Sequence, residues 1–482
     1  MNAAIRKVTL VIMLLFLVIF VQLNYLQVVT ADDLSSNPYN RRDLLRDMAS
    51  ERGDIYTADG ELVAISEETD DELEWIRKYP FAEMFAQISG YWSYQYFAEG
   101  LERSYNDELT GRTPELEFRD LSEILMDTRQ LGTLRLTIDS KAQRAAINAL
   151  GGLEGSVVAM DPQTGAILAM YSNPTYDPNL LAVHDRDTLD ANYHRLIDDP
   201  QKPTVAHSYR EIFAPGSAFK VITAASAIEM GYATPDSNYP VLTALDLPLT
   251  NLTLKNYGGS SCGGTLTESF KRSCNTSFGE IALDMGDDFA KALDNWGVDQ
   301  APPIDLLPGA ATGTAPQVGN FSQQKPQFAY AGIGQGDVSV TPLYMCMVAA
   351  TIANEGKMMT PHVVDQVLDS DGKVVERITP KVWREPISPD TAGQVKDMMI
   401  AVVNEGGTGT RAAIDGVVVA GKTGTAQVNG QDPGAWFVAF APADNPTVAI
   451  AVHVEDGGNV GGNASGGVVA APIARQVLEA IL

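Results

Sequence analysis

The chain has 482 residues, of which 45% are hydrophobic and 20% charged, which is ordinary for a folded protein with room for two or three domains. Its formal net charge is −27, and we exclude nucleic acid as a partner because that binding needs clustered Lys and Arg. We attribute the acidic balance to solubility or salt tolerance rather than to a substrate.

The N-terminus has the composition of a membrane anchor. Arg6 and Lys7 precede an uninterrupted apolar run over residues 10–21, and one helix of this kind spans a bilayer with its basic end in the cytoplasm. The small residues at 29–31 leave a cleaved signal peptide as the alternative. We expect residues 1–30 to be a cytoplasmic tail and single-pass anchor in the cell membrane, with the rest of the chain extracytoplasmic.

Residues 31–150 are rich in charge and in short apolar pieces, and we expect them to form a smaller, elongated N-terminal domain. At its end, the stretch "LRLTIDSKAQRAAINAL" (134–150) is typical of a strand that runs into a helix. Asp139 or Ser140 is the expected N-cap of this helix, because a short polar side chain satisfies free backbone N–H groups there.

Strand patterns lie at both ends of the remaining residues, 151–482. The stretch "GSVVAMDPQTGAILAMYS" places two apolar runs around a turn, which predicts a hairpin. Three more apolar runs lie near the C-terminus, with turn signals at Asn429-Gly430 and at 444–446, and a helix closes the chain. We therefore predict an α+β fold, in which a mainly antiparallel sheet is covered by helices.

The stretch "FAPGSAFKVITAASAIEMG" (213–231) predicts a buried helix that contains a lysine. Ser217 and Lys220 lie three residues apart at the helix start, which places Oγ and Nζ on one face. A lysine acts as a base only when burial or a neighbouring cation lowers its pKa. From this spacing alone, a catalytic pair and an exposed helix start are equally supported.

The serine-x-x-lysine spacing occurs twice more, and we attribute both occurrences to chance. Ser322 and Lys325 run into a proline, whereas Ser370 and Lys373 lie on an Asp-Gly turn. Neither lysine has an apolar helix around it that could remove it from water.

Two downstream motifs change the interpretation. Ser273-Cys274-Asn275 supplies a hydroxyl and an amide, and "GKTGTA" supplies Lys422, small hydroxyl residues and a glycine. Each is weak alone, because serine-x-asparagine recurs elsewhere and lysine-threonine-glycine is compatible with a plain strand end. In this order, however, the three motifs are the set of the penicillin-recognising serine acyltransferases.

The chain resembles the class B penicillin-binding proteins, which are membrane-anchored D,D-transpeptidases of peptidoglycan synthesis. The resemblance extends to residues 37–64, 155–170 and 332–356, and so covers most of the chain. The amino-acid sequences of these stretches are most similar to those of the actinobacterial penicillin-binding protein A branch. One departure is Cys274, which replaces the aspartate of the lactamase version of its motif.

The resemblance implies a role for each motif residue. Ser217 would attack the carbonyl between the last two D-alanines of a pentapeptide stem, and Lys220 would take its proton. Ser273 would relay a proton to the departing D-alanine, Asn275 would hold the substrate and steady Lys220, and Lys422 would keep the site electropositive. The remaining assignments are Thr423, Gly424 and Thr425 for substrate binding, and the backbone N–H groups of Ser217 and Thr425 for the oxyanion hole.

The resemblance also implies partners and domain roles. Peptidoglycan pentapeptide stems, penicillin and other β-lactams, the membrane, and a glycosyltransferase or other cell-wall machinery are the expected partners. Residues 31–150 would be a non-catalytic pedestal or dimerisation domain and 151–482 the transpeptidase domain, with a D,D-carboxypeptidase side activity. No metal or cofactor is expected. A β-lactamase or penicillin sensor, and a non-catalytic cell-wall scaffold, stay open as alternatives.

The chain has three cysteines. Cys346 lies in an apolar helical stretch, which indicates a buried free thiol. Cys262 and Cys274 therefore remain as the candidate disulfide of an exported protein, with two unpaired thiols as the alternative.

Overall fold

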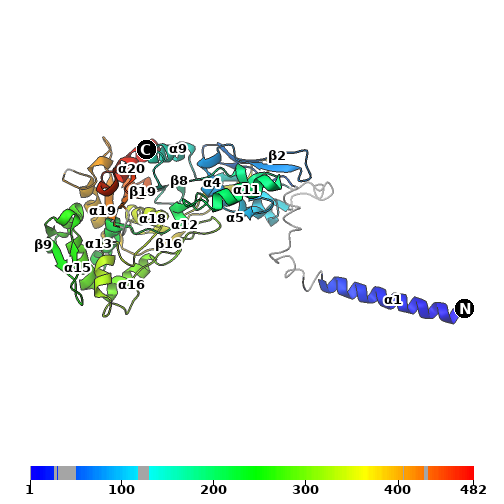
Figure 1. Ribbon diagram of the computed structural model, residues 1–482, viewed down its shortest axis with the longest axis horizontal. Coiled ribbons are helices and arrows are strands. Elements are labelled where there is room, and N and C mark those ends of the chain that lie inside the picture. The colour runs from blue at the N-terminus through cyan, green and yellow to red at the C-terminus, as the bar shows by residue number, and fades with distance from the viewer. Residues whose placement is uncertain (1, 27–29, 31–49, 118–129, 405, 428–431) are drawn as a thin grey trace. The chain divides into compact units, whose positions relative to one another are not determined.

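The computed structural model describes residues 2–26, 30, 50–117, 130–404, 406–427 and 432–482 (Figure 1). It divides into one unit of residues 1–51 with 68–76 and a second of 52–67 with 77–482. In the first unit, α1 (Asn2–Asn24) contains a 20-residue segment of mean hydropathy 2.3, which is compatible with a single-pass anchor. The cleavage signal at 29–31 and the start of the expected N-terminal domain lie largely outside the described residues.

The predicted antiparallel sheet is confirmed in the second unit. Its five strands follow the order β17-β18-β19-β7-β8, and every neighbouring pair is antiparallel. The predicted hairpin is β7 with β8, whereas the turn expected at Asn429-Gly430 lies outside the described residues. The strand bounds are β7 (Gly155–Met160), β8 (Ile167–Asn173), β17 (Ala420–Ala426), β18 (Gly434–Ala441) and β19 (Val448–Val454).

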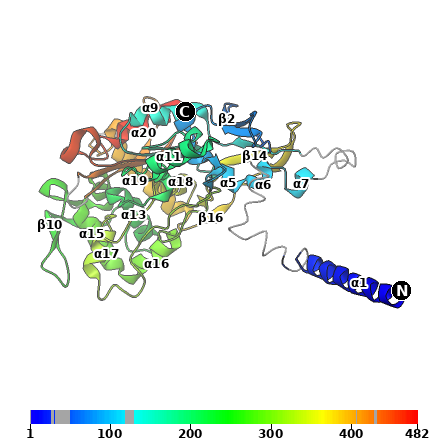
Figure 2. The ribbon, with the colours of Figure 1, turned by 45° about the vertical axis from the view of Figure 1, so that its right-hand side comes forward.

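Both faces of this sheet are covered, so its strands read as continuous apolar runs. In β18, Trp436 and Val438 face the core that contains α13 (Lys220–Glu229) and α18 (Pro342–Ala353). The alternate residue Phe437 faces the core that contains α9 (Ser140–Leu150) and α20 (Ala470–Ile481). Figures 1 and 2 both place α9 beside α20.

The helix α9 begins where the sequence predicted. The carboxylate of Asp139 accepts hydrogen bonds from the backbone N–H groups of Lys141 and Ala142, both at 2.9 Å, as expected of an N-cap. The neighbouring strand β6 (Thr133–Leu136) joins a second sheet of order β15-β14-β6-β1-β2-β3. The other bounds in that sheet are β1 (Ile55–Tyr56), β2 (Leu62–Glu68), β3 (Trp75–Lys78), β14 (Val364–Leu368) and β15 (Val374–Arg377).

Most of the elements that surround the three sequence motifs lie between β8 and β17. The short 3-10 turn η3 (Gly216–Phe219) leads into α13. The further elements are β9 (Asn238–Leu242), β10 (Ala244–Asp246), β11 (Thr253–Lys255), β12 (Cys262–Thr265), α14 (Leu266–Arg272), α15 (Asn275–Met285), α16 (Asp287–Trp296), α17 (Lys325–Ala331) and α19 (Pro389–Val403). Figure 2 shows α13, α15, α16 and α17 close together, in green to yellow-green.

Candidate active site

Ser217 lies in the 3-10 turn η3, not in the first turn of a continuous α-helix as the sequence predicted. The difference has a steric cause. Gly216 has φ +53°, donates its N–H to Gly334 O at 2.9 Å, and leaves no room for a Cβ, which would lie 2.4 Å from Thr425 O. The turn is thus held tightly against β17, and the tighter 3-10 geometry suits this position. Ser217 is half-buried and lines a cavity.

Lys220 begins α13 and is fully buried. Its Nζ donates to Ser273 O at 2.8 Å, to Asn275 Oδ1 at 2.7 Å and to Ser273 Oγ at 3.3 Å. Burial lowers its pKa well below the usual lysine range, and the charge of Lys422 lowers it further. Among the described residues, no hydrogen bond joins Lys220 Nζ to Ser217 Oγ. The lowered pKa favours a neutral amine at this position, and the contacts with Ser273 and Asn275 orient it.

Ser273 ends α14 in the left-handed region, with φ 64°. This backbone conformation is uncommon for a residue with a Cβ and persists where surrounding contacts hold it. Its Oγ accepts hydrogen bonds from Lys422 Nζ at 2.9 Å and from Lys220 Nζ at 3.3 Å. The hydroxyl of Ser273 thus joins the two buried lysines, which is the arrangement needed to pass a proton.

Lys422 lies on β17 and is also fully buried. Besides Ser273, its Nζ donates to Thr423 O at 2.9 Å. Burial lowers the pKa of Lys422 to about 7. In the described part of the chain neither Lys422 nor Lys220 forms an ion pair, so no carboxylate compensates the charge at this point.

The Asn275 amide is fixed from both ends. Its Oδ1 accepts from Lys220, while its Nδ2 donates to the backbone oxygen of Lys255 on β11 at 2.9 Å. The amide orientation follows from the Lys255 backbone oxygen, which can only accept a hydrogen bond and therefore faces Nδ2, leaving Oδ1 toward Lys220.

The strand β17 presents Thr423 and Thr425 to the cavity, two residues apart on one face. Thr423 Oγ1 shares a 2.7 Å hydrogen bond with Thr408 Oγ1. Gly424, between these two threonines, packs against the turn that contains Pro215. A Cβ at position 424 would be 2.7 Å from Pro215 O. Glycine therefore allows β17 to approach the turn that carries the serine, and the structure does not place Gly424 on the cavity wall.

The cavity has a volume of about 620 Å³ and brings together Ser217, Ser273, Asn275, Thr423 and Thr425. Lys220 and Lys422 lie buried beside them. Sequence reasoning missed many lining residues, among them Lys255, Tyr257, Arg272, Tyr330, Gln335 and Thr408. Of these, Thr408 could have been found from the sequence, because its stretch "EGGTGT" is rich in hydroxyl residues and glycine and resembles the "KTGT" of β17.

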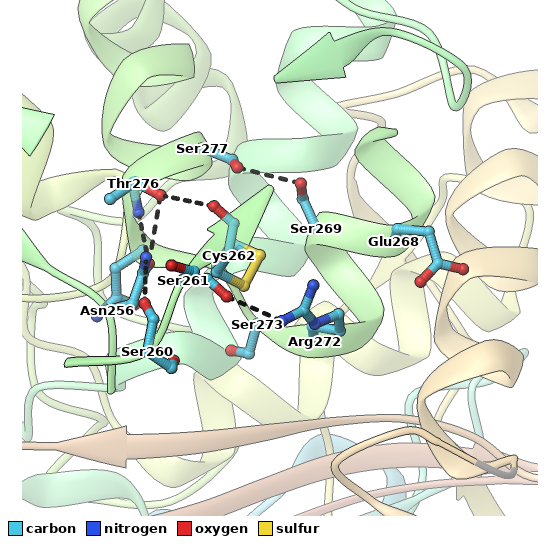
Figure 3. Close-up of a disulfide and its surroundings, with 12 residues drawn as sticks. Asn256, Ser260, Ser261, Cys262, Glu268, Ser269, Arg272, Ser273, Thr276 and Ser277 are labelled. Carbon is cyan, nitrogen blue, oxygen red and sulfur yellow. Dashed lines mark hydrogen bonds between the residues drawn. A yellow bond between two sulfur atoms is a disulfide. The ribbon is translucent and has the colours of Figure 1, made fainter. Parts of the chain in front are cut away.

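The predicted disulfide between Cys262 and Cys274 is confirmed, with the two Cα atoms 5.3 Å apart. Figure 3 shows it joining β12 to the segment that contains Ser273. Asn275 follows Cys274 directly and begins α15. The bond thus ties the serine-x-asparagine motif to a neighbouring strand. Cys346 is a buried free thiol, as expected.

We predict that loss of this disulfide weakens both the fold and the reaction. In the double variant Cys262→Ser/Cys274→Ser, the free energy of unfolding should fall by about 3 kcal/mol in the chain-entropy account. Acylation by penicillin should slow as well, because a misplacement of about 1 Å at reacting groups costs roughly a hundredfold in rate. Denaturant unfolding and stopped-flow acylation measure the two effects.

Peptide mapping without reductant provides the control for the disulfide itself. The wild-type protein, exported into an oxidising compartment, should give one linked peptide containing Cys262 and Cys274. Cys346 should be alkylated only after unfolding, because it is buried. Free, alkylatable Cys262 and Cys274 would contradict the bond, and unchanged acylation in the double variant would contradict its effect on the reaction.

Comparison with known families gives matches to two parts of the chain. A family model described as the penicillin binding protein transpeptidase domain matches residues 155–479. A second, described as the penicillin binding protein A dimerisation domain, matches residues 52–133.

Relatives match over the whole length. The peptidoglycan D,D-transpeptidase PbpA of Mycolicibacterium smegmatis is 40% identical, with 100% of this chain and 99% of the relative aligned. The protein of the same name from Mycobacterium tuberculosis is 36% identical over the same shares. A ceftriaxone acyl-enzyme complex of M. tuberculosis penicillin-binding protein A has a TM-score of 0.83 and 35% identity, covering 91% of this chain and 100% of that one.

A penicillin G acyl-enzyme complex of the same M. tuberculosis protein is similar to this chain with a TM-score of 0.81 and 34% identity. The likeness covers 89% of this chain and 99% of the solved one. The penicillin-binding fold and its smaller N-terminal domain thus extend over nearly all of the chain.

Proposed function

The chain belongs to the penicillin-binding protein transpeptidase family, and from that premise we propose that it is a peptidoglycan D,D-transpeptidase with Ser217 as its nucleophile. The observation that carries this proposal is the convergence of the two buried lysines, Lys220 and Lys422, on Ser273 Oγ beside the cavity that Ser217 lines. Buried amines with lowered pKa supply a base at neutral pH, which serine acyl transfer requires. β-Lactams would acylate the same serine.

In the acylation half, the neutral amine of Lys220 takes the proton of Ser217 Oγ. The oxygen attacks the carbonyl of the penultimate D-alanine of a pentapeptide stem, and the peptide C–N bond breaks. Ser273 gives its proton to the departing D-alanine amine and is reprotonated from the lysines that contact it. In the second half, the amine of an acceptor stem attacks the acyl-enzyme and forms the cross-link.

The strand β17 would hold the donor at its C-terminal end. Thr423 and Thr425 have hydroxyls on the cavity face that can donate to the terminal carboxylate. The backbone oxygen of Thr423 accepts a hydrogen bond from Lys422 Nζ, so the backbone groups of Thr423 point toward the site. Backbone groups two residues apart on a strand point to the same side, so the N–H of Thr425 points toward the site as well. Together with the Ser217 N–H it would form the oxyanion hole.

The proposal extends to the cellular setting. The apolar helix α1 would anchor the chain as a single-pass membrane protein, and residues 151–482 would form an extracytoplasmic transpeptidase domain on a non-catalytic domain of residues 31–150. Pentapeptide stems would be its substrate and a glycosyltransferase its working partner, because cross-linking needs newly made glycan strands.

We predict that acylation loses rate above about pH 7 as Lys422 gives up its proton. The pKa of Lys422 is lowered to about 7, so the charge that attracts a substrate carboxylate is present below this pH and lost above it. The same shift makes the folded state more stable as pH rises from about 7 toward the ordinary lysine pKa, because the unfolded chain then binds more protons.

The second-order rate constant for penicillin acylation, measured against pH, tests this because it reports groups of the free enzyme. Lys422→Arg keeps a charge at every accessible pH, so its profile should lack the alkaline fall. An identical fall in wild type and Lys422→Arg would show that another group is responsible.

Fluorescent penicillin tests the proposed function against its nearest competitor. The full-length protein should take up one label and hold it for many minutes, as a transpeptidase does when water cannot replace the acceptor amine. Rapid loss of label with turnover of the antibiotic would indicate a β-lactamase instead.

A further inference from the structure

The cavity wall carries two exposed cations, Lys255 and Arg272. Neither side chain forms an ion pair within the described part of the chain. None of the described residues that line the cavity is Asp or Glu, although 61 of the 482 residues are acidic. A site of positive charge on a protein with net charge −27 is a distinct electrostatic feature, and it favours an anionic group on the ligand.

A backbone hydrogen bond holds the guanidinium of Arg272 in place, and no ion pair within the described part of the chain neutralises its charge. Its Nη2 donates to Ser261 O at 2.9 Å. Glu268 lies four residues earlier on α14, a spacing that commonly forms an ion pair, but Figure 3 shows its carboxylate pointing away from the guanidinium. The disulfide between Cys262 and Cys274 lies next to this hydrogen bond in sequence. Cys262 follows Ser261, and Cys274 lies two residues after Arg272. The remaining N–H groups of Arg272 are therefore available to a ligand.

Lys255 contacts the serine-x-asparagine motif and lines the same cavity as Arg272. Its backbone oxygen accepts the Asn275 Nδ2 hydrogen bond at 2.9 Å, and its ammonium group has no partner among the described residues. The terminal carboxylate of the donor is already assigned to Thr423 and Thr425 on β17. Lys255 and Arg272 adjoin Asn275, on the segment proposed to hold the peptide itself, and are free for a different anion.

We propose that Lys255 and Arg272 bind a second carboxylate of the donor stem peptide, on a residue that precedes the scissile bond. This assignment rests on the proposed function and names its preferred substrate: stems with free carboxylates, in preference to stems in which those groups are carboxamides. A guanidinium and an ammonium bind a carboxylate through charge-assisted hydrogen bonds. When the ligand is a neutral amide, the electrostatic attraction between opposite charges is lost and the hydrogen bonds are weaker.

Two donor pentapeptides that both end in D-Ala-D-Ala test the proposal. One has free carboxylates on its second and third residues, and the other has carboxamides there. With the full-length protein and an acceptor stem that has a free amine, the same acceptor in both arms, kcat/KM for D-alanine release should be about tenfold higher for the carboxylate stem, the range expected for a hydrogen bond to a charged group. In Lys255→Gln/Arg272→Gln, kcat/KM for the carboxylate stem should fall to that of the carboxamide stem.

A matched control removes two positive charges elsewhere. Lys141→Gln/Lys357→Gln changes two exposed lysines that do not line the cavity, and it should keep the wild-type preference. One penicillin adduct per chain confirms that each variant is folded. The wild-type preference should also shrink with added salt, because exposed charges are screened.

The outcomes separate the two claims. A wild-type preference for the carboxamide stem, equal rates for the two stems, or a preference that survives Lys255→Gln/Arg272→Gln would overturn the second carboxylate site while leaving the transpeptidase assignment in place. Absence of D-alanine release from both stems would overturn the proposed function and, with it, the site that rests on it.

Discussion

Ser217→Ala should abolish the covalent adduct that penicillin forms with this protein. Ser217 is half-buried at the edge of the cavity, three residues before the fully buried Lys220. Removal of its hydroxyl removes the proposed nucleophile, and Ser273, the other hydroxyl near Lys220, is assigned to proton transfer, so the loss should be complete rather than partial. Intact-mass spectrometry after penicillin treatment should show one adduct per wild-type chain and none in the variant.

The chain provides its own matched controls for this experiment. Ser322 and Ser370 begin the other two serine-x-x-lysine pairs, and both lie in exposed turns. Ser322→Ala and Ser370→Ala should each take up one penicillin, as the wild type does. An adduct that persists in Ser217→Ala, or that maps to Ser322 or Ser370, would contradict the assignment of the nucleophile.

Lys220→Arg should slow penicillin acylation by about a hundredfold to ten-thousandfold, the usual contribution of a general base. Arginine keeps the positive charge but does not deprotonate in proteins. The pKa of Lys220 is lowered by burial and by the charge of Lys422, so the native residue is available as a neutral amine. Stopped-flow measurement of the second-order acylation constant gives the effect.

Lys220→Met separates charge from basicity in the same experiment. Methionine is unbranched and fits apolar surroundings, so this variant should fold and should be as slow as Lys220→Arg. Thermal unfolding of both variants shows whether the core around α13 is intact. Near-normal acylation by Lys220→Arg together with slow acylation by Lys220→Met would show that only the positive charge was needed.

The sheet and the three motifs could be predicted from the sequence because their signals are local. The strands β18 and β19 are buried on both faces, which makes each a continuous apolar run that is visible without any neighbour. The motif residues resemble a known family in residue type and order. The pairing of Cys262 with Cys274 followed from the apolar stretch around Cys346, again a local observation.

The rest of the site depends on residues that meet only in the folded chain. The 3-10 turn at Ser217 is set by close contacts of Gly216 with Gly334 and Thr425, which lie far away in sequence. The contact of Thr408 with Thr423 joins the loop after α19 to β17, and Lys255 reaches Asn275 from β11. Periodicity and composition carry no information about such contacts, so sequence reasoning missed these contacts.

Formation of a peptide cross-link by the purified full-length protein tests the central claim most directly. The protein is incubated with a donor pentapeptide ending in D-Ala-D-Ala and an acceptor stem with a free amine, and the products are analysed by mass spectrometry. We predict a cross-linked product that has lost one D-alanine, formed by wild type and absent with Ser217→Ala. Cross-linking by Ser217→Ala, or hydrolysis of the donor by wild type with no cross-link at any acceptor concentration, would contradict a transpeptidase that works through Ser217.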